Sequence, residues 1–197
     1  MTIITLPATE PERARMELAG ADNPLSSFTG SSVVVESVEF LWVLEFAIKR
    51  QSDSEARAWK SAVAQLSRLS NTFRYTPPEY TGNSAGYSGA APVVKGAGQL
   101  GLTLNADGVT ASAAIAKEGD YIEAGGELKV LTADADSDIG GNVTFSIFPP
   151  FRNSPADNST IEIDAPAATF RMVRPSAGWD VSSPLRHDFQ IQAIEAF

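Results

Sequence analysis

The chain has 197 residues, a formal net charge of −9 and no cysteine. A hydrophobic content of 43% with 20% charged residues is ordinary for a folded protein and argues against wholesale disorder. The missing cysteines exclude disulfides, thiolate metal ligands and a cysteine nucleophile. The N-terminus has no signal-peptide pattern and no apolar run is long enough to span a bilayer, so we expect no membrane partner.

Acidic side chains are concentrated in the middle of the chain. Between Ala85 and Ala165, four basic residues stand against eleven acidic ones, a net −7, and the rest of the chain carries −2. A segment this acidic repels phosphate backbones. We therefore expect no specific nucleic-acid binding by the middle segment.

The first part of the chain predicts strands. Val33–Val35 and Phe40–Lys49 are rich in β-branched and aromatic residues. In the second segment, large apolar side chains alternate with period two, which places them on one face of a strand. These residues are Phe40, Trp42, Leu44, Phe46 and Ile48.

A helix is predicted to follow. Ser52 and Glu55 match a capping box, in which the hydroxyl accepts a backbone N–H and the carboxylate reaches back to the cap. Apolar residues then recur at helical spacing, namely Ala56, Trp59, Val63, Leu66 and Leu69. Phe73 and Tyr75 begin a further strand. The residues expected in the core between helix and sheet are Trp42, Trp59, Leu66 and Phe73.

The middle of the chain differs from the first part in composition and in its predicted elements. From Tyr80 to Ala91 the composition changes to Gly, Ser, Ala and Tyr, which is typical of a linker or a domain crossing. Beyond it we expect strands and hairpin turns: alternating leucines at Leu100, Leu102 and Leu104, turns at 106–108 and 124–126, and a strand at Val143–Phe148.

After about residue 165 the sequence again resembles the first part of the chain in its composition and strand pattern. The sequence therefore predicts a mainly β protein with one helix. A β-sandwich domain of residues 1–85 and 165–197 would be interrupted by a small β-barrel or β-sandwich of residues 86–164.

Asp134, Asp136 and Asp138 alternate like the start of a calcium-binding loop. An EF-hand loop needs glycine at position six and a bidentate glutamate at position twelve, where this stretch has Ile139 and Phe145. We interpret the segment as the acidic turn of a hairpin, and we predict neither a metal nor a cofactor.

The single histidine, His187, lies between Arg186 and Asp188. A histidine in such a setting is typically a surface residue. No nucleophile-elbow serine accompanies it, and no phosphate-binding glycine motif follows a strand. A distant serine partner and a glycosidase-like carboxylate pair stay open, because both depend on geometry. We expect no enzymatic activity.

Aromatic residues offer a binding interpretation. Tyr80, Tyr87 and Tyr121 could stack on sugar rings. Alternatively, the first two anchor the domain crossing and Tyr121 packs in its sheet, which we favour because tyrosines are common in Gly/Ser-rich loops. Trp179 lies in a Pro/Ser/Gly loop and is a candidate interface residue, because loop tryptophans often mark interfaces.

Several short motifs occur in a characteristic order. They are Asn23-Pro-Leu-Ser-Ser-Phe-Thr-Gly30, a strand with Trp42, Ala56-x-x-Trp59 with Leu66, Phe73, Gly119-Asp120, and the stretch from Asp134 to Pro149. In this order, over nearly the whole chain, the sequence resembles the distal tail proteins of long-tailed bacteriophages. It is most similar to the type whose ring-forming belt domain is interrupted by an insert of the oligonucleotide/oligosaccharide fold. Ser31, Ser32 and Ser37 depart from the family pattern, which has larger polar residues there.

The resemblance implies a structural virion protein without enzymatic activity. Six copies would form a ring in the virion tail, assembled in the host bacterial cytoplasm, that joins the tail tube to the baseplate hub and lets DNA pass through its lumen. Phe28 and Trp179 would be interface residues. The alternative is a carbohydrate-binding module that attaches to host-surface glycans through the barrel. A third hypothesis is a small hydrolase that uses carboxylates.

Overall fold

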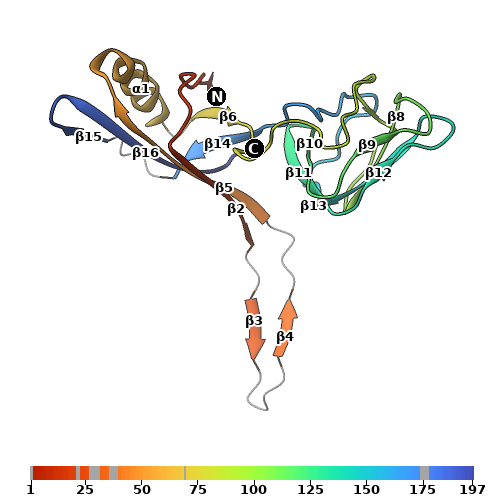
Figure 1. The fold of residues 1–197 in the computed structure, drawn as a ribbon. Helices are drawn as coiled ribbons and strands as arrows, with labels where there is room; N and C mark the ends of the chain where they lie inside the picture. The colour runs from red at the N-terminus through yellow and green to blue at the C-terminus, as the bar shows by residue number, and fades with distance from the viewer. Residues whose placement is uncertain (1, 21–22, 27–31, 36–39, 69, 174–177) are drawn as a thin grey trace. The chain divides into compact units, whose positions relative to one another are not determined.

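The computed structural model describes residues 2–20, 23–26, 32–35, 40–68, 70–173 and 178–197 (Figure 1). The chain divides into two compact units. Unit 1 consists of Met1–Pro78 and Thr169–Phe197, and unit 2 of Glu79–Ala168. The predicted mainly β class is confirmed, and the described residues contain one α-helix.

Unit 2 is longer at both ends than the 86–164 insert expected from composition. Hydrogen bonds explain the difference. The Glu79 carboxylate accepts the Tyr121 hydroxyl at 2.6 Å, and the Tyr80 hydroxyl donates to the carbonyl of Ile163 at 2.5 Å. At the other end, the Ala167 N–H donates to Glu123 at 3.0 Å. Both flanks therefore belong to unit 2.

Unit 1 is built on one seven-stranded sheet (Figure 1). Its order is β1 (Thr2–Ile3), β6 (Asn71–Tyr75), β14 (Ala168–Met172), β16 (Arg186–Glu195), β5 (Phe40–Gln51) and β2 (Arg13–Gly20), with β15 (Trp179–Ser182) also paired to β16. β1 and β6 are parallel, whereas β14, β15 and β5 pair with β16 in antiparallel fashion, as β2 does with β5. That this unit is a sandwich stays a prediction.

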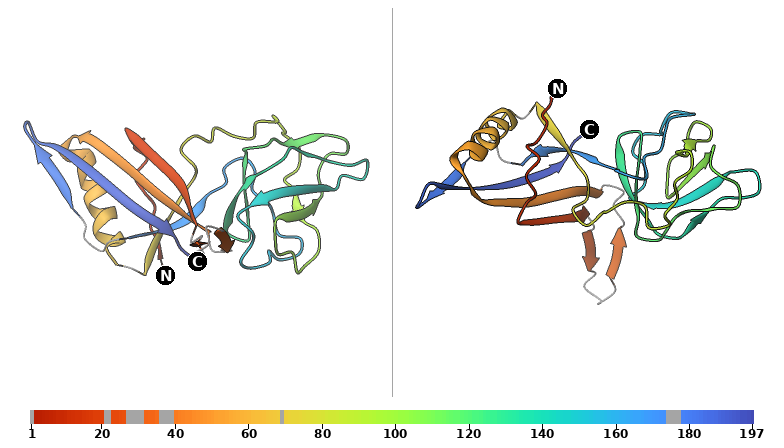
Figure 2. Two further views of the ribbon diagram at one scale, coloured as in Figure 1. Left: turned by 90° about the horizontal axis from the view of Figure 1, so that it is seen from below. Right: turned by 45° about the horizontal axis from the view of Figure 1, so that its top comes forward.

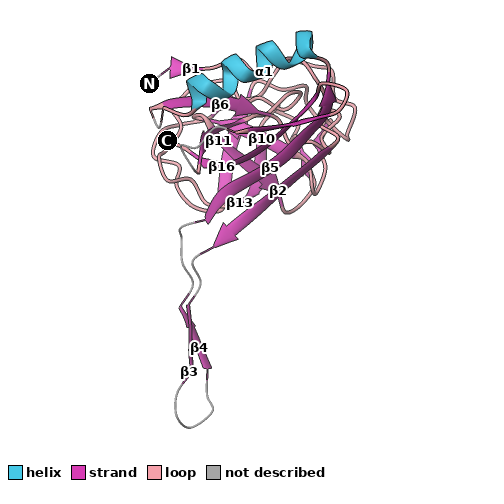
Figure 3. Cartoon of the chain, turned by 90° about the vertical axis from the view of Figure 1, so that its left-hand side faces the viewer, coloured by secondary structure: helices cyan, strands magenta, loops and turns pink. Residues whose placement is uncertain are grey.

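Helix α1 (Asp53–Leu66) packs on one face of that sheet (Figure 3). The capping box forms as predicted: Ser52 Oγ accepts the Glu55 N–H at 3.5 Å, and Glu55 Oε2 accepts the Ser52 N–H at 2.9 Å. The four residues expected in the core, Trp42, Trp59, Leu66 and Phe73, are all buried. Leu69, expected on the same helix face, lies outside the described residues.

The chain between β2 and β5 contains a small antiparallel pair, β3 (Asn23–Ser26) and β4 (Ser32–Val35). Asn23 is paired with Val35, and Ser26 with Ser32. The predicted strand at Val33–Val35 thus lies in β4. Phe28, a candidate interface residue, falls outside the described residues.

Unit 2 contains a five-stranded sheet and a separate two-stranded one. The larger has the order β10 (Tyr121–Ala124), β11 (Glu127–Leu131), β13 (Val143–Phe148), β8 (Thr103–Asp107) and β7 (Val93–Val94), and the smaller pairs β12 (Ala135–Asp136) with β9 (Ala114–Ala116). The edge strands β7 and β10 are bridged by one segment, through Thr160 and Glu162. This segment therefore connects the two edges of the five-stranded sheet. Its oligonucleotide/oligosaccharide-fold identity stays a prediction.

Two local predictions in unit 2 had different outcomes. The 124–126 turn is a two-residue hairpin loop in which Gly125 and Gly126 both have positive φ, as a type I′ turn requires. The alternating leucines, by contrast, do not form a strand before Thr103. Leu100 and Leu102 are exposed, because the positive φ of Gly101 (109°) turns the chain there.

Candidate functional site

The largest side chains of unit 1 meet between α1 and the sheet. The Phe46 ring stacks on Tyr75 at 5.4 Å and meets Trp59 edge-on at 6.2 Å. The N-terminal segment runs from β1 to β2 (red in Figure 2), and its residues line a cleft together with these three aromatic side chains. This cleft, called here the N-terminal cleft, has a volume of about 380 Å³. It is lined by Ile3, Ile4, Thr5, Leu6, Pro7, Thr9, Pro11, Phe46, Trp59, Arg74, Tyr75 and Thr76.

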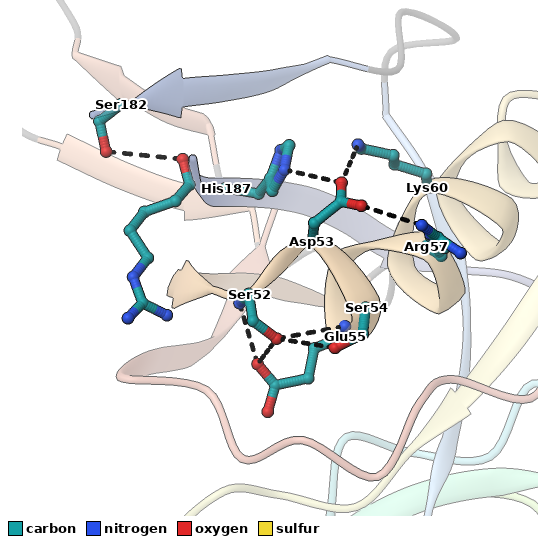
Figure 4. Close-up of polar contacts among 9 residues, drawn as sticks. Ser52, Asp53, Ser54, Glu55, Arg57, Lys60, Ser182 and His187 are labelled. Atoms are coloured by element: carbon teal, nitrogen blue, oxygen red, sulfur yellow. Dashed lines mark hydrogen bonds and ion pairs between the residues drawn. The ribbon is translucent and has the colours of Figure 1, made fainter. Parts of the chain in front are cut away.

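His187 corrects the expectation of a surface histidine, because only 4% of it is exposed. The register of β16 against β5 places it on the same face as Phe189 and Ile191, beneath the start of α1. Its Nε2 lies 3.4 Å from Asp53 Oδ1 (Figure 4). The signal missed in the sequence was period-two alternation: His187, Phe189 and Ile191 are the buried positions of one strand.

Asp53 is the centre of a polar cluster at the first turn of α1 (Figure 4). Its Oδ2 accepts a hydrogen bond from Arg57 at 3.1 Å, and Lys60 Nζ lies 3.8 Å from Oδ1. The Arg57 hydrogen bond is the main cause that lowers the pKa of the Asp53 carboxyl. The cluster thus places His187 of β16 beside the first turn of α1, although neither ring nitrogen of His187 has a hydrogen-bond partner among the described residues.

A second contact lies between the β15–β16 hairpin and the helix. Lys60 Nζ lies 5.6 Å from the centroid of the Trp179 ring, which also contacts Phe189 at 6.2 Å. Trp179 still exposes 40% of its surface. Residues 181–185 are called here the hairpin tip. Two apolar side chains of this tip are exposed, Val181 (55%) and Leu185 (69%). Trp179, expected in a loop, therefore lies in strand β15, in a hairpin that exposes Trp179, Val181 and Leu185 among polar neighbours.

The opposite face of the sheet mixes polar and apolar side chains. Arg13 and Gln190 flank Ala47 in one cross-strand row, and Gln192 donates to Glu45 at 2.8 Å in the next. At the margin of the sheet, β2 pairs with β5, and no other described strand pairs with it. An edge strand presents unpaired backbone groups that can bind another chain. β2 is thus a second candidate contact surface.

The tyrosines of unit 2 are engaged with their own unit. The Tyr80 and Tyr121 rings meet edge-on at 5.8 Å, and their hydroxyls donate within unit 2. Burial raises the pKa of both phenols. The Tyr87 hydroxyl donates to Ala90 and accepts the Thr110 N–H at 3.0 Å. The three hydroxyls are therefore engaged within unit 2, and stacking of sugars on the tyrosine rings stays a prediction.

The acidic stretch is held by hydrogen bonds. Asp134 accepts the Glu118 N–H and the Lys117 ammonium, both at 2.9 Å. Asp138 accepts the backbone N–H groups of Gly140 and Asn142 at 2.7 and 2.9 Å. These backbone hydrogen bonds are the main causes that lower the pKa of both carboxyls. Across the residues that the structure describes, no group of three or more His, Asp or Glu side chains is arranged to hold a metal ion.

A buried ion pair in unit 2 was not anticipated from the sequence. Lys129 Nζ lies 2.6 Å from Glu127 Oε2, and both side chains are at least 96% shielded from solvent. Glu127 also accepts the backbone N–H groups of Arg152 and Asn153 at 3.2 and 3.1 Å. The spacing of two residues in a strand puts both charges on one face, which was the available signal.

The sequence matches none of the protein-family models and none of the curated proteins with which it was compared. In the described ranges, α1 lacks the length and the apolar character that a membrane-crossing helix needs. The geometry of unit 1 offers three candidate contact surfaces, which are the N-terminal cleft, the hairpin tip and the β2 edge.

Proposed function

We propose that this chain is a distal tail adaptor of a long-tailed bacteriophage. Six copies form a ring that joins the tail tube to the baseplate hub, and the protein has no enzymatic activity. The carrying observation is the β2 edge: eight residues, Arg13–Gly20, pair on one side with β5 and on the other with no described strand. Backbone groups on such an edge can pair with a strand of a neighbouring copy.

The contrast between the two units supports this proposal. In unit 2, the edge strands β7 and β10 are both bridged by residues 160–162, which leaves little edge for pairing with another chain. In unit 1, the sheet stays open at β2. This difference supports assembly through unit 1, with unit 2 as an appended domain. The family resemblance assigns the same roles to the two regions.

The charge distribution agrees with this division. Residues 79–168 carry twelve acidic and four basic side chains, a net −8, and the remaining residues carry −1. Like charges within a Debye length of about 8 Å repel one another at physiological salt. Copies that associated through unit 2 would bring these charges together, whereas the residues of unit 1 carry a net charge of only −1.

Light scattering combined with negative-stain electron microscopy tests the proposal. We expect rings of about 125 kDa from six copies of the 20.9 kDa chain, formed either alone or on addition of the tail-tube and hub proteins. A species that stays monomeric in both conditions would refute the proposal. A stable monomer that binds cell-surface glycans on an array would instead favour the carbohydrate-binding alternative.

A further inference from the structure

We propose that β2 of one copy pairs with β15 of the next, so that the sheet of unit 1 continues from copy to copy. This inference rests on the proposed ring, because it concerns contacts between copies of this chain, and it names the strand that binds the β2 edge. β15 pairs with β16 on one side and with no described strand on the other, and all four of its residues are exposed. β2 and β15 lie on opposite sides of β5 and β16 in the sheet (Figure 2). The remaining edge strand that the structure describes in this sheet, β1, has only two residues and offers less backbone for pairing.

The strand directions suit such a contact. β2 is antiparallel to β5, β5 to β16, and β16 to β15, so β2 and β15 of one sheet run in opposite directions. A rotation from copy to copy about an axis roughly along the strands preserves these directions, and β2 therefore meets the next β15 as an antiparallel partner. The rotation also keeps α1 on the same side of the sheet in every copy. Because the two edges differ, the contact is heterologous and can close into a ring.

The outer side of Asp180 is suited to a cation. Asp180 is paired with Asp188 of β16, and like charges in directly opposite positions destabilise a sheet. Both carboxylates face away from α1, because Asp188 alternates with the buried Phe189. Asp188 accepts the Arg50 N–H at 2.7 Å, whereas the exposed side chain of Asp180 has neither an ion pair nor a hydrogen bond among the described residues. A positive charge on a strand paired with β15 would offset this repulsion.

β2 carries positive charge on the matching face. Arg13 and Arg15 lie on the face turned away from α1, as the register of β2 against β5 shows. Arg15 already forms an ion pair with Glu17 of its own strand. Arg13 is exposed, and its side chain has no such partner in the described part of the chain. Charge complementarity therefore favours β15 as the strand that pairs with β2.

The alternation of the two faces limits the register. Asp180 has to lie opposite an odd-numbered residue of β2, because only those face away from α1. Opposite Glu17 it would meet a like charge, and opposite Ala19 it would have no cation beside it. Opposite Arg13, half of β15 would extend beyond the start of β2. Opposite Arg15, all four residues of β15 pair with β2, and Arg13 lies at a diagonal position that a long side chain can reach.

The same register matches apolar side chains on the face that carries α1. It places Val181 opposite Ala14 of the next copy, and Trp179 opposite Met16. In the single copy, Val181 and Trp179 expose 55% and 40% of their surface, and Ala14 and Met16 are partly exposed. Pairing would remove this apolar surface from water, which favours association.

The absence of cysteine makes a crosslinking test clean. The test variant carries Ala14→Cys and Val181→Cys in one chain, because directly opposite residues of an antiparallel pair lie about 4.5–5.5 Å apart, within the range of a disulfide. Oxidised glutathione under assembly conditions should then give covalent oligomers on a non-reducing gel. The matched control carries Leu18→Cys with Val181→Cys. Leu18 faces the same side as Ala14 but lies about 14 Å further along β2, so the control should give no covalent oligomers.

The outcomes separate this inference from the proposed ring. If the wild-type chain assembles but the test variant gives no covalent oligomers, the pairing of β2 with β15 is wrong and the ring stands. A covalent dimer from Ala14→Cys alone would mean that two β2 edges meet, and one from Val181→Cys alone that two hairpins meet. Either result overturns the pairing. A wild-type chain that stays monomeric, alone and with the tail-tube and hub proteins, refutes the ring and this pairing with it.

A charge reversal tests the contact without cysteine. Asp180→Arg would place a third cation beside Arg13 and Arg15, and should weaken self-association about tenfold or more in sedimentation velocity. The matched control is Asp136→Arg, which makes the same change of net charge at an exposed strand residue of unit 2 and should leave self-association unchanged. Equal losses in the two variants, or no loss in either, would overturn the pairing.

Discussion

Truncation of Trp59 to alanine is the sharpest test of how unit 1 is held together. Trp59 is 1% exposed and lies between the sheet and α1, where its ring contacts Phe46 and Phe189, both at 6.2 Å. Replacing such a side chain removes its contacts and leaves a cavity that the surroundings fill only in part. Truncations of this kind cost about 3–5 kcal/mol.

One feature of Trp59 reduces that cost. Its indole Nε1 is buried and has no hydrogen-bond acceptor among the described residues. A buried donor without a partner costs about 1–3 kcal/mol, and the truncation removes this penalty together with the ring. We therefore expect Trp59→Ala to lower the free energy of unfolding of unit 1 by about 3 kcal/mol, and its melting temperature by about 10 °C or more.

Trp59→Phe is the matched control, because it retains an aromatic ring and removes only the unpaired N–H and part of the volume. We expect a loss of about 1 kcal/mol or less for this variant. Differential scanning calorimetry of the full chain, supported by far-UV circular dichroism, would follow both variants. If Trp59→Phe is as unstable as Trp59→Ala, the indole N–H has a partner and the reasoning fails. If Trp59→Ala costs less than about 1 kcal/mol, α1 does not pack through this residue.

Four further predictions concern unit 2. Residues 79–168 expressed alone should fold, with a β-type circular dichroism spectrum and a cooperative melt, and an unstructured fragment would contradict the division into units. Lys129→Met should destabilise unit 2 by about 3–5 kcal/mol, because it leaves the Glu127 carboxylate buried without its ammonium partner, whereas a neutral result would mean that the pair contributes nothing. The pKa of Asp138 is lowered by the Asn142 N–H, so its contribution to stability is present above the unfolded value of 3.8 and is lost as pH falls through the lower folded value. Between pH 5 and pH 2 the melting temperature should therefore fall less for Asp138→Asn than for the wild type. An equal fall in the two proteins would count against the hydrogen bond. Millimolar calcium or a chelator should leave the melting temperature unchanged, because the loop after Asp134 lacks the twelfth-position carboxylate, and a clear rise with calcium would contradict this reading.

Some features of this protein follow from residues that are close in sequence. The capping box of Ser52 and Glu55 determines where α1 begins, because both partners lie within one helical turn. The glycine pair at 125–126 determines a tight turn, because only residues that tolerate positive φ fit there. The apolar alternation of β5 is also local. From such signals the mainly β class, the single predicted helix and the acidic middle segment could be obtained from the sequence alone.

Other features depend on contacts between residues that are far apart along the chain. His187 is buried because β16 aligns with β5 and lies beneath α1, although its immediate neighbours are charged. The start of unit 2 at Glu79 depends on hydrogen bonds to Tyr121 and Ile163. The Lys129 ammonium tolerates full burial because the chain returns at Pro150, whose carbonyl accepts from it at 3.1 Å.

The candidate surfaces show the same division. Trp179 could be singled out from the sequence, because a tryptophan among Pro, Ser and Gly residues stands out locally, although the structure places it in strand β15. The cleft could not be, since its lining comes from the N-terminal segment, β5, α1 and β6, which meet only in the folded unit. Local signals reflect the preferences of neighbouring residues, whereas burial, pairing and clefts depend on which distant segments pack together. The sequence alone therefore determined the mainly β class and the start of α1, and only the tertiary structure decided what is buried and which surfaces remain for a partner.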